Sequence, residues 1–539
     1  MKTYTKEQFA KDVVAGIIVA IIALPLSIAL ALASGVTPEK GIYTAIVAGF
    51  VISFLGGSRV QISGPTAAFA TIVAGIVATK GLEGLAIATI MAGIILILMG
   101  LFRLGTLIKF IPFTITTGFT AGIAVTIVIG QIKDFLGLTV VSEEPLVETM
   151  DKLSYDIKFI NTFNRQAFLV GMGSLMVLIL WPMKKRPKFL SKIPPSLIAV
   201  IVGIVMVKVI GLKANTIGDL YTISNALPHF SLPSVTLAGI IDLIPNAFTI
   251  AVLAAIESLL SCVVSDSMVN SRHNSNMELV AQGAGNIASA LFGGIPATGA
   301  IARTAANVKN GGRTPIAGMV HAAVLLLVLV VLMPYAALIP MPTIAAILFM
   351  VAYNMCGWRT FVNLCKTAPK SDIIVLFATF ILTIVFDLVV AIEVGMVLTC
   401  ILFIKRMSEV TLVQGWKLVD DENDPDSITL RQVPEHTMVY EISGPMFFGA
   451  ADKILGITVS EEMTNLVLRM RSVNAIDSTA TNALTTLYEN CKKNNVRLIL
   501  SHVNEQPMSI LEKSGLVDKI GRENFCEHID AALARAEEK

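Results

Sequence analysis

Two stretches of the sequence interrupt long apolar runs with glycine, proline and small polar residues. They are "FLGGSRVQISGPTAAFA", residues 54–70, and "LFGGIPATGAIARTAAN", residues 291–307. In the first stretch, residues 60–63 are predicted to be extended, and Pro65 favours the first turn of a helix. Because a helix N-terminus has unpaired N–H groups and a partial positive charge, each stretch could bind an anion. The alternative interpretation is that both stretches are ordinary Gly/Pro kinks.

Glu257 lies in the middle of another apolar run, "AFTIAVLAAIESLLSCVVSD". In a helix, Ser261 and Ser265 share its face, at positions i+4 and i+8. A carboxylate in apolar surroundings is costly unless it is paired or protonated. Glu257 with Ser261 is therefore a candidate site for a proton or another cation. The alternative is a structural acid that serine hydroxyls cap.

Arg303 is the basic residue of the second stretch and lies near the start of its predicted helix. Its guanidinium could supply positive charge to an anion held at the helix end. Two alternatives remain open. The side chain could extend along the helix to reach water, or it could pair with Glu257.

Composition places the protein in a lipid bilayer. The chain is 54% hydrophobic and only 15% charged, with a mean hydropathy of +0.75, whereas about 25% charged residues are usual in soluble proteins. The six cysteines are scattered without a CxxC pair, so neither disulfides nor a metal cluster is predicted. After "MKTYTKEQFAKD" the apolar span is too long for a signal peptide and has no cleavage motif, so we expect the first helix to be retained.

Charge divides the chain into two parts. Up to Arg406 there are 28 Lys and Arg against 18 Asp and Glu, a net charge of +10. Beyond it there are 13 against 21, a net charge of −8. We therefore expect a transmembrane domain, residues 1–406, followed by a soluble domain, residues 407–539.

Apolar segments of bilayer length number about fourteen. With a cytoplasmic N-terminus, nineteen cationic residues lie inside and eight outside, Arg303 left aside, which satisfies the positive-inside rule. The third segment is only about 22 Å long at ~1.5 Å per residue, against ~30 Å for the hydrocarbon core, and the tenth is shorter still. These two half-helices enter from opposite sides and are predicted to meet head to head near the midplane. The predicted segments are residues 13–34, 42–56, 65–79, 85–101, 114–132, 166–182, 196–212, 238–264, 279–292, 298–309, 316–334, 338–355, 372–389 and 390–406.

Several longer motifs resemble the SulP family of anion transporters. They include "ALPLSIALALASGV", "GGSRVQISGPTAAF" and "RHNSNMELVAQGAGNIASALFGGIPATGAIARTAANVKNGGRTP", and the similarity extends over essentially the whole chain. The resemblance implies an α-helical polytopic membrane protein with core and gate domains built from a 7+7 inverted repeat, like uracil permease. It also implies a homodimer, substrate bound between the third and tenth helices, and an elevator-like movement of core against gate.

The same resemblance assigns candidate roles to individual residues. Glu257 and Ser261 match positions where a sodium-dependent bicarbonate member binds its cation with Asp and Thr, and Glu in place of Asp favours protons over sodium. Leu26 stands where many sulfate transporters of the family have Gln, which removes one polar contact of the first helix. The residues implied to bind the anion are Thr66, Ala67, Gly299, Ala300, Ile301 and Arg303.

The C-terminal part alternates short apolar strands such as "NLVLRMRSV" and "VRLILSHV" with amphipathic helices such as "ATNALTTLYENCKKN". It resembles an α/β STAS domain. Ser478 and Thr479 match the stretch that is phosphorylated in anti-sigma-factor antagonists, with Ala480 replacing the usual Gly. The alternative is that these hydroxyls simply cap a helix. The expected role of the domain is regulation, with a protein partner, or dimer packing.

The expected function is secondary active uptake of a small anion. Sulfate is the favoured substrate, and a C4-dicarboxylate or bicarbonate is the next candidate. Coupling to protons is favoured over sodium, and an exchanger or a channel remains an alternative. The motif G-x-x-x-x-G-K-[ST] is absent, so ATP-driven transport is not supported. We expect no enzyme activity, cofactor, metal or nucleic-acid partner. The expected location is the cytoplasmic membrane, with both termini in the cytoplasm.

Overall fold

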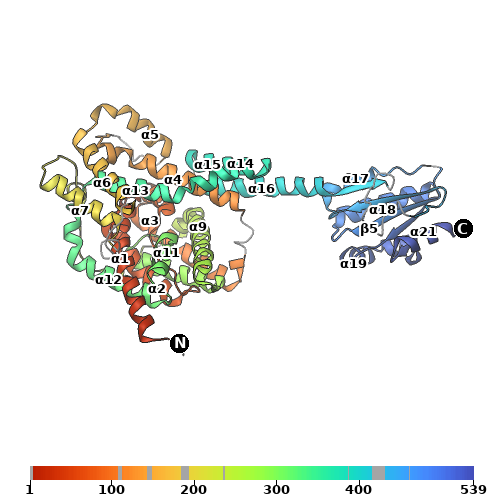
Figure 1. Cartoon of the computed structure of the whole chain (residues 1–539), viewed down its shortest axis with the longest axis horizontal. Coiled ribbons are helices and arrows are strands. Elements are labelled where there is room, and N and C mark those ends of the chain that lie inside the picture. Colours follow the sequence, from red (N-terminus) through yellow and green to blue (C-terminus); the bar gives the residue numbers. More distant parts are fainter. Residues whose placement is uncertain are drawn as a thin grey trace. The chain divides into compact units, whose positions relative to one another are not determined.

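The computed structural model describes residues 4–106, 112–141, 148–183, 193–234, 237–386, 388–415, 431–460 and 462–538. The chain divides into two compact units, Met1–Met396 and Val397–Lys539. The first is almost entirely helical, whereas the second combines a sheet with helices (Figure 1).

Helices of the first unit follow the apolar segments of the sequence. Each of the fourteen predicted segments contains a helix, and seven helices in the described part are long and apolar enough to cross a membrane. The count of fourteen crossings stays a prediction. The helices are α1 (Lys6–Ala33), α2 (Pro38–Leu55), α3 (Ala67–Leu101), α4 (Phe113–Leu136), α5 (Thr149–Lys158), α6 (Arg165–Met183), α7 (Pro195–Lys208), α8 (Ile217–Leu220), α9 (Leu237–Val269), α10 (Ser275–Leu291), α11 (Ile301–Lys309), α12 (Ile316–Ala336), α13 (Met341–Cys356), α14 (Trp358–Thr367), α15 (Lys370–Val385) and α16 (Leu388–Val410), which continues beyond Met396 into the second unit.

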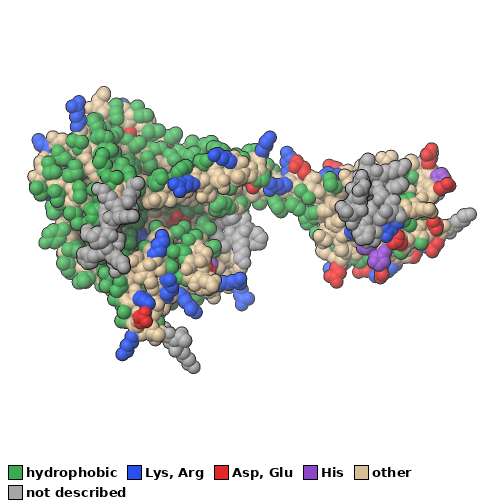
Figure 2. Space-filling model, in the orientation of Figure 1, with side chains coloured by type: hydrophobic (Ala, Val, Ile, Leu, Met, Phe, Trp, Pro, Cys, Tyr) green, Lys and Arg blue, Asp and Glu red, His purple; other side chains and the backbone are tan. Residues whose placement is uncertain are grey.

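Large apolar side chains cover much of the surface of this unit. Phe54, Leu101 and Leu327 are more than 60% exposed, for example, and Figure 2 shows hydrophobic side chains over most of the visible face. A soluble protein rarely exposes an apolar patch of this extent, so the surface fits contact with lipid tails.

Helix α3 contains a break that makes its first part short. Gly81 has φ 69° and ψ −173°, and this non-helical conformation divides the helix. The part before Gly81 is about 21 Å long, and α11 is about 14 Å long, at ~1.5 Å per residue. Neither spans the ~30 Å hydrocarbon core, as predicted for the two half-helices.

Two very short strands precede these half-helices. Strand β1 (Ser63–Gly64) and strand β2 (Thr298–Gly299) pair antiparallel, with Ser63 opposite Gly299 and Gly64 opposite Thr298. The 2-residue ladder joins chain segments that lie more than 230 positions apart in sequence. The predicted meeting of the two interrupted stretches is therefore made by backbone pairing.

The helices of the first unit fall into two packed groups. Helix α3 packs against α9 and α10, α10 packs against α2, and α12 packs against α1 and α2. In the other group, α4 packs against α13 and α15, and α6 packs against α7 and α13. Close approach of α3 and α10 depends on Gly93 and Gly283, because a Cβ on either would overlap the backbone of the other helix.

The second unit is an α/β domain. Its sheet has the order β3-β4-β5-β6-β7, and all neighbouring strands are parallel except the β3–β4 pair. One face of the sheet packs on α17 to α20, and the other packs on α21. The elements are β3 (Leu412–Gly415), β4 (Thr437–Ser443), α17 (Ala451–Leu455), β5 (Asn465–Ser472), α18 (Ser478–Lys493), β6 (Arg497–Ser501), α19 (Glu505–Lys513), α20 (Leu516–Ile520), β7 (Phe525–Cys526) and α21 (Ile529–Glu537).

Candidate functional site

The two half-helices start at the ends of the β1–β2 ladder. Thr66 is the N-cap residue of α3, and Ala300 is the N-cap residue of α11. The backbone N–H of Ala300 donates to the carbonyl oxygen of Ile62 at 2.9 Å, which extends the pairing beyond the strands. Because the strands are antiparallel, the helices leave the ladder in opposite directions. Two positive helix ends therefore lie close together.

Neither helix end is capped by a side chain. Thr66 has a hydroxyl but makes no capping hydrogen bond, and Ala300 has no polar side chain. Thr66 and Ala300 keep some accessible surface, and Ile301 is 45% exposed. On α3 the N–H of Phe69 donates to the carbonyl oxygen of Thr66 at 3.3 Å. The N–H groups of Ala67 and Ala68, with those at the start of α11, are therefore the ones offered to an anion that approaches from this side.

Besides Arg303, two of the predicted anion-binding residues, Ala67 and Gly299, are buried. Ala67 is 6% exposed. At Gly299, a Cβ would overlap Nε2 of Gln61, so the space beside this glycine is filled by the Gln61 side chain. Any contact of these residues with the anion would have to come through the backbone. Gly299 has a second role that its sequence position did not reveal, since it admits Gln61 to the back of the ladder.

Glu257 projects from α9 toward the N-terminus of α3. Its Oε2 accepts a hydrogen bond of 2.8 Å from Oγ1 of Thr66, and the described residues provide no other hydrogen bond to this carboxylate. The hydroxyl of Ser261 is 3.5 Å from Oγ1 of Thr304, and Ser265 donates to the carbonyl of Cys262 at 2.9 Å. The alternative in which serines cap Glu257 is therefore wrong, because these hydroxyls have other partners.

Arg303 is buried behind the ladder. Its side chain is 1% exposed, and Nη2 donates to the carbonyl oxygen of Pro65 at 2.5 Å. A Cβ on Gly64 would overlap Nη1, and neither Nη1 nor Nε has a hydrogen-bond partner in the described part of the chain. The side chain does not reach water, and it forms no ion pair with Glu257 among the described residues. Both alternatives for Arg303 are wrong for this conformation.

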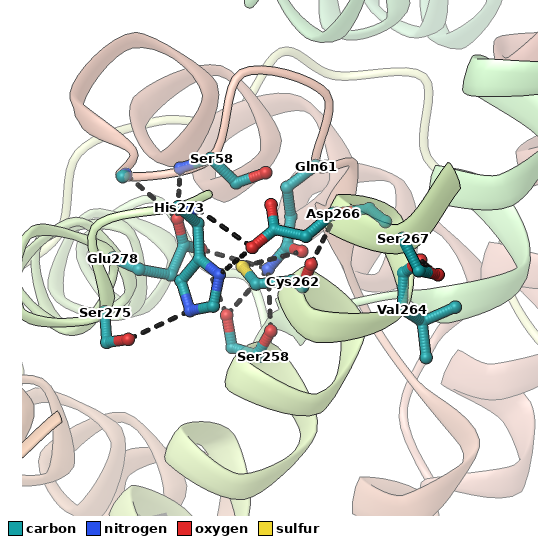
Figure 3. A network of polar contacts seen from close by, with 12 residues as sticks. Ser58, Gln61, Ser258, Cys262, Val264, Asp266, Ser267, His273, Ser275 and Glu278 are labelled. Atoms are coloured by element: carbon teal, nitrogen blue, oxygen red, sulfur yellow. Dashed lines mark hydrogen bonds and ion pairs between the residues drawn. The ribbon is translucent and has the colours of Figure 1, made fainter. Parts of the chain in front are cut away.

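Glu278, which the sequence analysis did not single out, anchors the segment before β1 (Figure 3). Its carboxylate is fully buried and accepts five hydrogen bonds of 2.9–3.2 Å, all from neutral donors. The available signal was an acid in the first turn of a helix with a polar N-cap, Asn274. The donors are the backbone N–H groups of Gly57 and Ser58 and the side chains of Gln61, Ser258 and Gln282.

The connection between α9 and α10 is fixed by a second carboxylate. Oδ2 of Asp266 accepts from the backbone N–H of His273 at 3.0 Å and contacts its ring Nδ1 at 2.7 Å. Nε2 of the same ring contacts Oγ of Ser275 at 2.9 Å (Figure 3). Together with Glu278, this contact fixes α9, α10 and the segment before β1 relative to one another.

In the second unit, Asp477 is the N-cap of α18. Its Oδ1 accepts from the N–H of Ala480 at 2.8 Å, and its Oδ2 accepts from the N–H of Phe448 at 2.9 Å. Ser478 and Thr479 follow as exposed residues of the first turn. The alternative in which these two hydroxyls cap the helix is wrong, because the carboxylate of Asp477 already does so.

The fold and the paired half-helices define a class of protein, the multi-pass membrane carrier of anions with a C-terminal α/β domain. Residues 9–379 match the sulfate permease family, and residues 427–532 match the STAS domain. The chain belongs to the sulfate permease family, which confirms the resemblance seen in its motifs.

Two relatives indicate which anions occur among similar proteins. YvdB of Bacillus subtilis, a candidate sulfate transporter, is 42% identical over 98% of this chain and 98% of its own length. The bicarbonate transporter BicA of Picosynechococcus is 32% identical over 82% of this chain and 79% of its own length.

Two solved structures show the same fold. The transmembrane domain of a cyanobacterial BicA covers 72% of this chain and 98% of its own, with 28% identity and a TM-score of 0.64. The murine anion transporter Slc26a9 in an inward-facing state covers 100% of this chain and 93% of its own, with 19% identity and a TM-score of 0.86. At that identity the second match supports the fold alone.

Proposed function

We propose that this protein takes up a small anion, sulfate first, by proton-coupled secondary transport. The observation that supports this most directly is the β1–β2 ladder, because it brings two uncapped helix N-termini together beside Glu257. Discontinuous helices with N-termini that point at an anion are a recurrent solution for substrate binding in secondary transporters.

In this proposal the anion lies between the ends of α3 and α11. Backbone N–H groups after Thr66 and Ala300 donate to its oxygens, and Ile301 lines the approach. The buried guanidinium of Arg303 adds a positive charge from behind the ladder without contact with water. Ala67 and Gly299 contribute backbone only.

The surroundings of Glu257 support coupling to protons rather than to sodium. Sodium is bound by several oxygen ligands, whereas a proton needs a single carboxylate oxygen. The hydroxyl of Thr66 is the one partner of this carboxylate in the described part of the chain, and Ser261 is directed at Thr304 instead. We therefore assign Glu257 to proton coupling and give Ser261 a supporting position beside α11.

Movement of the site across the membrane is assigned to the two packed groups of helices. The group around α3, α9 and α10 contains both half-helices and is the proposed core, and the group around α4, α13 and α15 is the proposed gate. Glu278 and Asp266 hold the core together by short hydrogen bonds, so it can move as one body. An elevator-like displacement of core against gate would then carry the anion.

Bicarbonate is the second candidate substrate, because a bicarbonate transporter is 32% identical to this chain. Uptake of labelled sulfate and of labelled bicarbonate into proteoliposomes that contain the purified full-length protein separates the two. Each is measured with an inward proton gradient, an inward sodium gradient, or neither.

For the proposed function we expect saturable sulfate uptake that an acidic exterior stimulates and sodium does not. Glu257→Gln should abolish the response to the proton gradient and retain sulfate exchange. Stimulation by protons that persists unchanged in Glu257→Gln would contradict the assignment of this residue. Uptake of bicarbonate alone would transfer the proposal to the second substrate.

We further propose that the protein is a homodimer of the cytoplasmic membrane, with both termini in the cytoplasm. The STAS domain would then face cytoplasmic regulatory proteins, and the exposed hydroxyls of Ser478 and Thr479 are accessible to a kinase. Thiol labelling of Cys526 in intact and permeabilised cells tests the orientation, since only permeabilised cells should be labelled.

A further inference from the structure

The contact between Thr66 and Glu257 connects the proposed anion site to the proposed proton site. A hydroxyl has a single hydrogen to donate, and an ionised carboxylate can only accept. At an oxygen–oxygen distance of 2.8 Å, the hydrogen of Thr66 is therefore committed to Glu257 whenever that residue is ionised. The oxygen of Thr66 then presents only lone pairs to the space at the end of α3.

Protonation of Glu257 reverses this hydrogen bond. A carboxylic acid has an O–H of its own, which can donate to the oxygen of Thr66 across the same 2.8 Å. The hydrogen of Thr66 is then released and can turn toward an anion at the helix N-terminus. No atom has to move beyond rotation of one hydroxyl, so the change suits a site built into a rigid core.

We propose that Thr66 relays the protonation state of Glu257 to the anion by reversing the direction of this hydrogen bond. With Glu257 ionised, Thr66 offers lone pairs that repel an anion. With Glu257 protonated, Thr66 offers a donor that binds it. Proton and anion would thus favour each other's binding, and by thermodynamic linkage the effect is the same in both directions. The inference rests on the proposed function, because it presumes an anion between α3 and α11.

Helix capping at α3 agrees with this role. A threonine at an N-cap ordinarily accepts a hydrogen bond from the N–H two or three residues later. Thr66 occupies the N-cap of α3 with extended backbone, φ −125° and ψ 159°, yet makes no such bond. Its hydroxyl is directed to Glu257 instead. The N–H groups of Ala67 and Ala68 are thereby left for the anion, while that of Phe69 donates to the carbonyl oxygen of Thr66 at 3.3 Å.

Other charged groups near α9 do not replace this contact. On α3 the first charged residue is Lys80, thirteen positions beyond the start of the helix, where it pairs with Asp242. On α10, Glu278 is saturated by five donors. On α11, Arg303 is directed at Pro65, and Lys309 is the exposed last residue of the helix. Strand β2 has no charged residue.

The test measures the dissociation constant of inorganic sulfate for the purified full-length protein between pH 5.5 and 8. Four proteins are compared: wild type, Thr66→Val, Thr66→Ser and Glu257→Gln. Valine has the shape of threonine without the hydroxyl, and serine restores the hydroxyl. Thr89→Val is the matched control, because Thr89 is a buried threonine of α3 whose hydroxyl bonds to Leu85 within its own helix.

For wild type we expect sulfate to bind more tightly at low pH. The pH effect is expressed as the dissociation constant at pH 8 divided by that at pH 5.5. Because a hydrogen bond to a charged group is worth roughly tenfold in affinity, Thr66→Val should reduce this ratio by about tenfold. Thr66→Ser and Thr89→Val should keep the ratio. Glu257→Gln should make binding independent of pH, since its amide N–H can donate to Thr66 at any pH.

The outcomes separate this inference from the function on which it rests. Wild-type pH dependence that disappears in Glu257→Gln but persists within twofold in Thr66→Val overturns the relay and leaves proton coupling through Glu257 intact. A wild type that binds sulfate equally at every pH overturns both the relay and proton coupling. A wild type that binds no sulfate overturns sulfate as the substrate and, with it, the relay between Glu257 and bound sulfate.

Discussion

The two interrupted stretches reach the same geometry by different means. The first stretch, before α3, is held largely by side chains of the second half-helix. Thr304 accepts from the N–H of Ile62 at 3.0 Å, and Asn307 donates to the carbonyl of Val60 at 2.9 Å. Arg303 donates to Pro65 at the end of the same stretch. Helix α11 is therefore both half of the site and the scaffold of the other half.

The second stretch, before α11, is held from elsewhere. Asn286 of α10 exchanges two hydrogen bonds of 2.8 Å with the backbone of Ala297. Thr298 donates to the carbonyl of Ala254 in α9 at 2.9 Å, and Thr44 of α2 bonds to both backbone groups of Ile295. Substitutions that displace α11 should therefore affect both halves of the site, whereas those at the start of α3 should have a local effect.

The largest effect is expected from filling the space between the helix ends. Thr66→Phe or Ala300→Leu should abolish anion uptake, because even ~1 Å of lost approach forfeits the hydrogen bonds to the anion. Both side chains are apolar, so the proteins should still insert and fold. Uptake and sulfate affinity of the purified, monodisperse variants provide the measurement. Normal transport by both variants would show that the substrate does not bind between the two helix ends, and it would contradict the assignment of the two stretches to one anion site.

Alanine at the two ladder glycines should distinguish the two stretches. Gly299→Ala pushes a Cβ into Gln61, which is pinned by Ser258 and Glu278, whereas Gly64→Ala meets the longer side chain of Arg303. We expect uptake to fall about 100-fold for Gly299→Ala, as for an ~1 Å misplacement of a site, and less for Gly64→Ala.

Gly130→Ala in α4 is the control for both glycine variants, because the space around its Cβ is open. Its uptake should match that of wild type. Equal and small losses of uptake for Gly299→Ala and Gly64→Ala would show that the ladder tolerates displacement. They would also show that the fixed position of Gln61 does not matter for transport.

Removal of the Arg303 guanidinium should lower the affinity of the site for the anion. For Arg303→Ala we expect roughly tenfold weaker sulfate binding, because a positive charge close behind the ladder is lost, with little loss of folded protein. Arg303→Lys keeps the charge and should lose less. Sulfate titration alongside the yield of monodisperse protein is the measurement. An unchanged affinity for sulfate would mean that Arg303 has only a structural role, as the donor to the carbonyl of Pro65.

The smallest effect is expected from single threonine hydroxyls of the two stretches. Thr304→Val leaves the buried N–H of Ile62 without an acceptor, at a cost of ~1–3 kcal/mol. Thr298→Val removes a donor to Ala254, whose carbonyl lies inside α9 and retains its helix partner, so the cost should be below ~1 kcal/mol. Thermal unfolding of both variants shows which of the two loses more stability, and we expect it to be Thr304→Val. The reverse order would contradict the scaffold role of α11.

Much of this site could be predicted from the sequence, but its supporting residues could not. Gly, Pro and small polar residues in apolar runs marked both half-helices, and Glu257 was marked by its position in an apolar segment. Glu278 and Gln61 give no comparable signal, because most of their hydrogen-bond partners lie 197 to 221 positions away in the sequence. Arg303 could be recognised as a candidate from its residue type. The orientation of its side chain could not, because it depends on where Pro65 and Gly64 lie.

The amino-acid sequence is sufficient to predict the apolar segments, the shortening of two of them, and the STAS domain that follows. These properties depend on local composition, since transfer to the bilayer and helix initiation are decided within a few turns. Three features are visible only in the folded protein: residues 63–64 pair with residues 298–299, Thr66 faces Glu257, and Asp477 caps α18 in place of the hydroxyls beside it. Hydrogen bonds act over about 3 Å, and the partner within that distance is set by packing of the whole core rather than by neighbours in sequence.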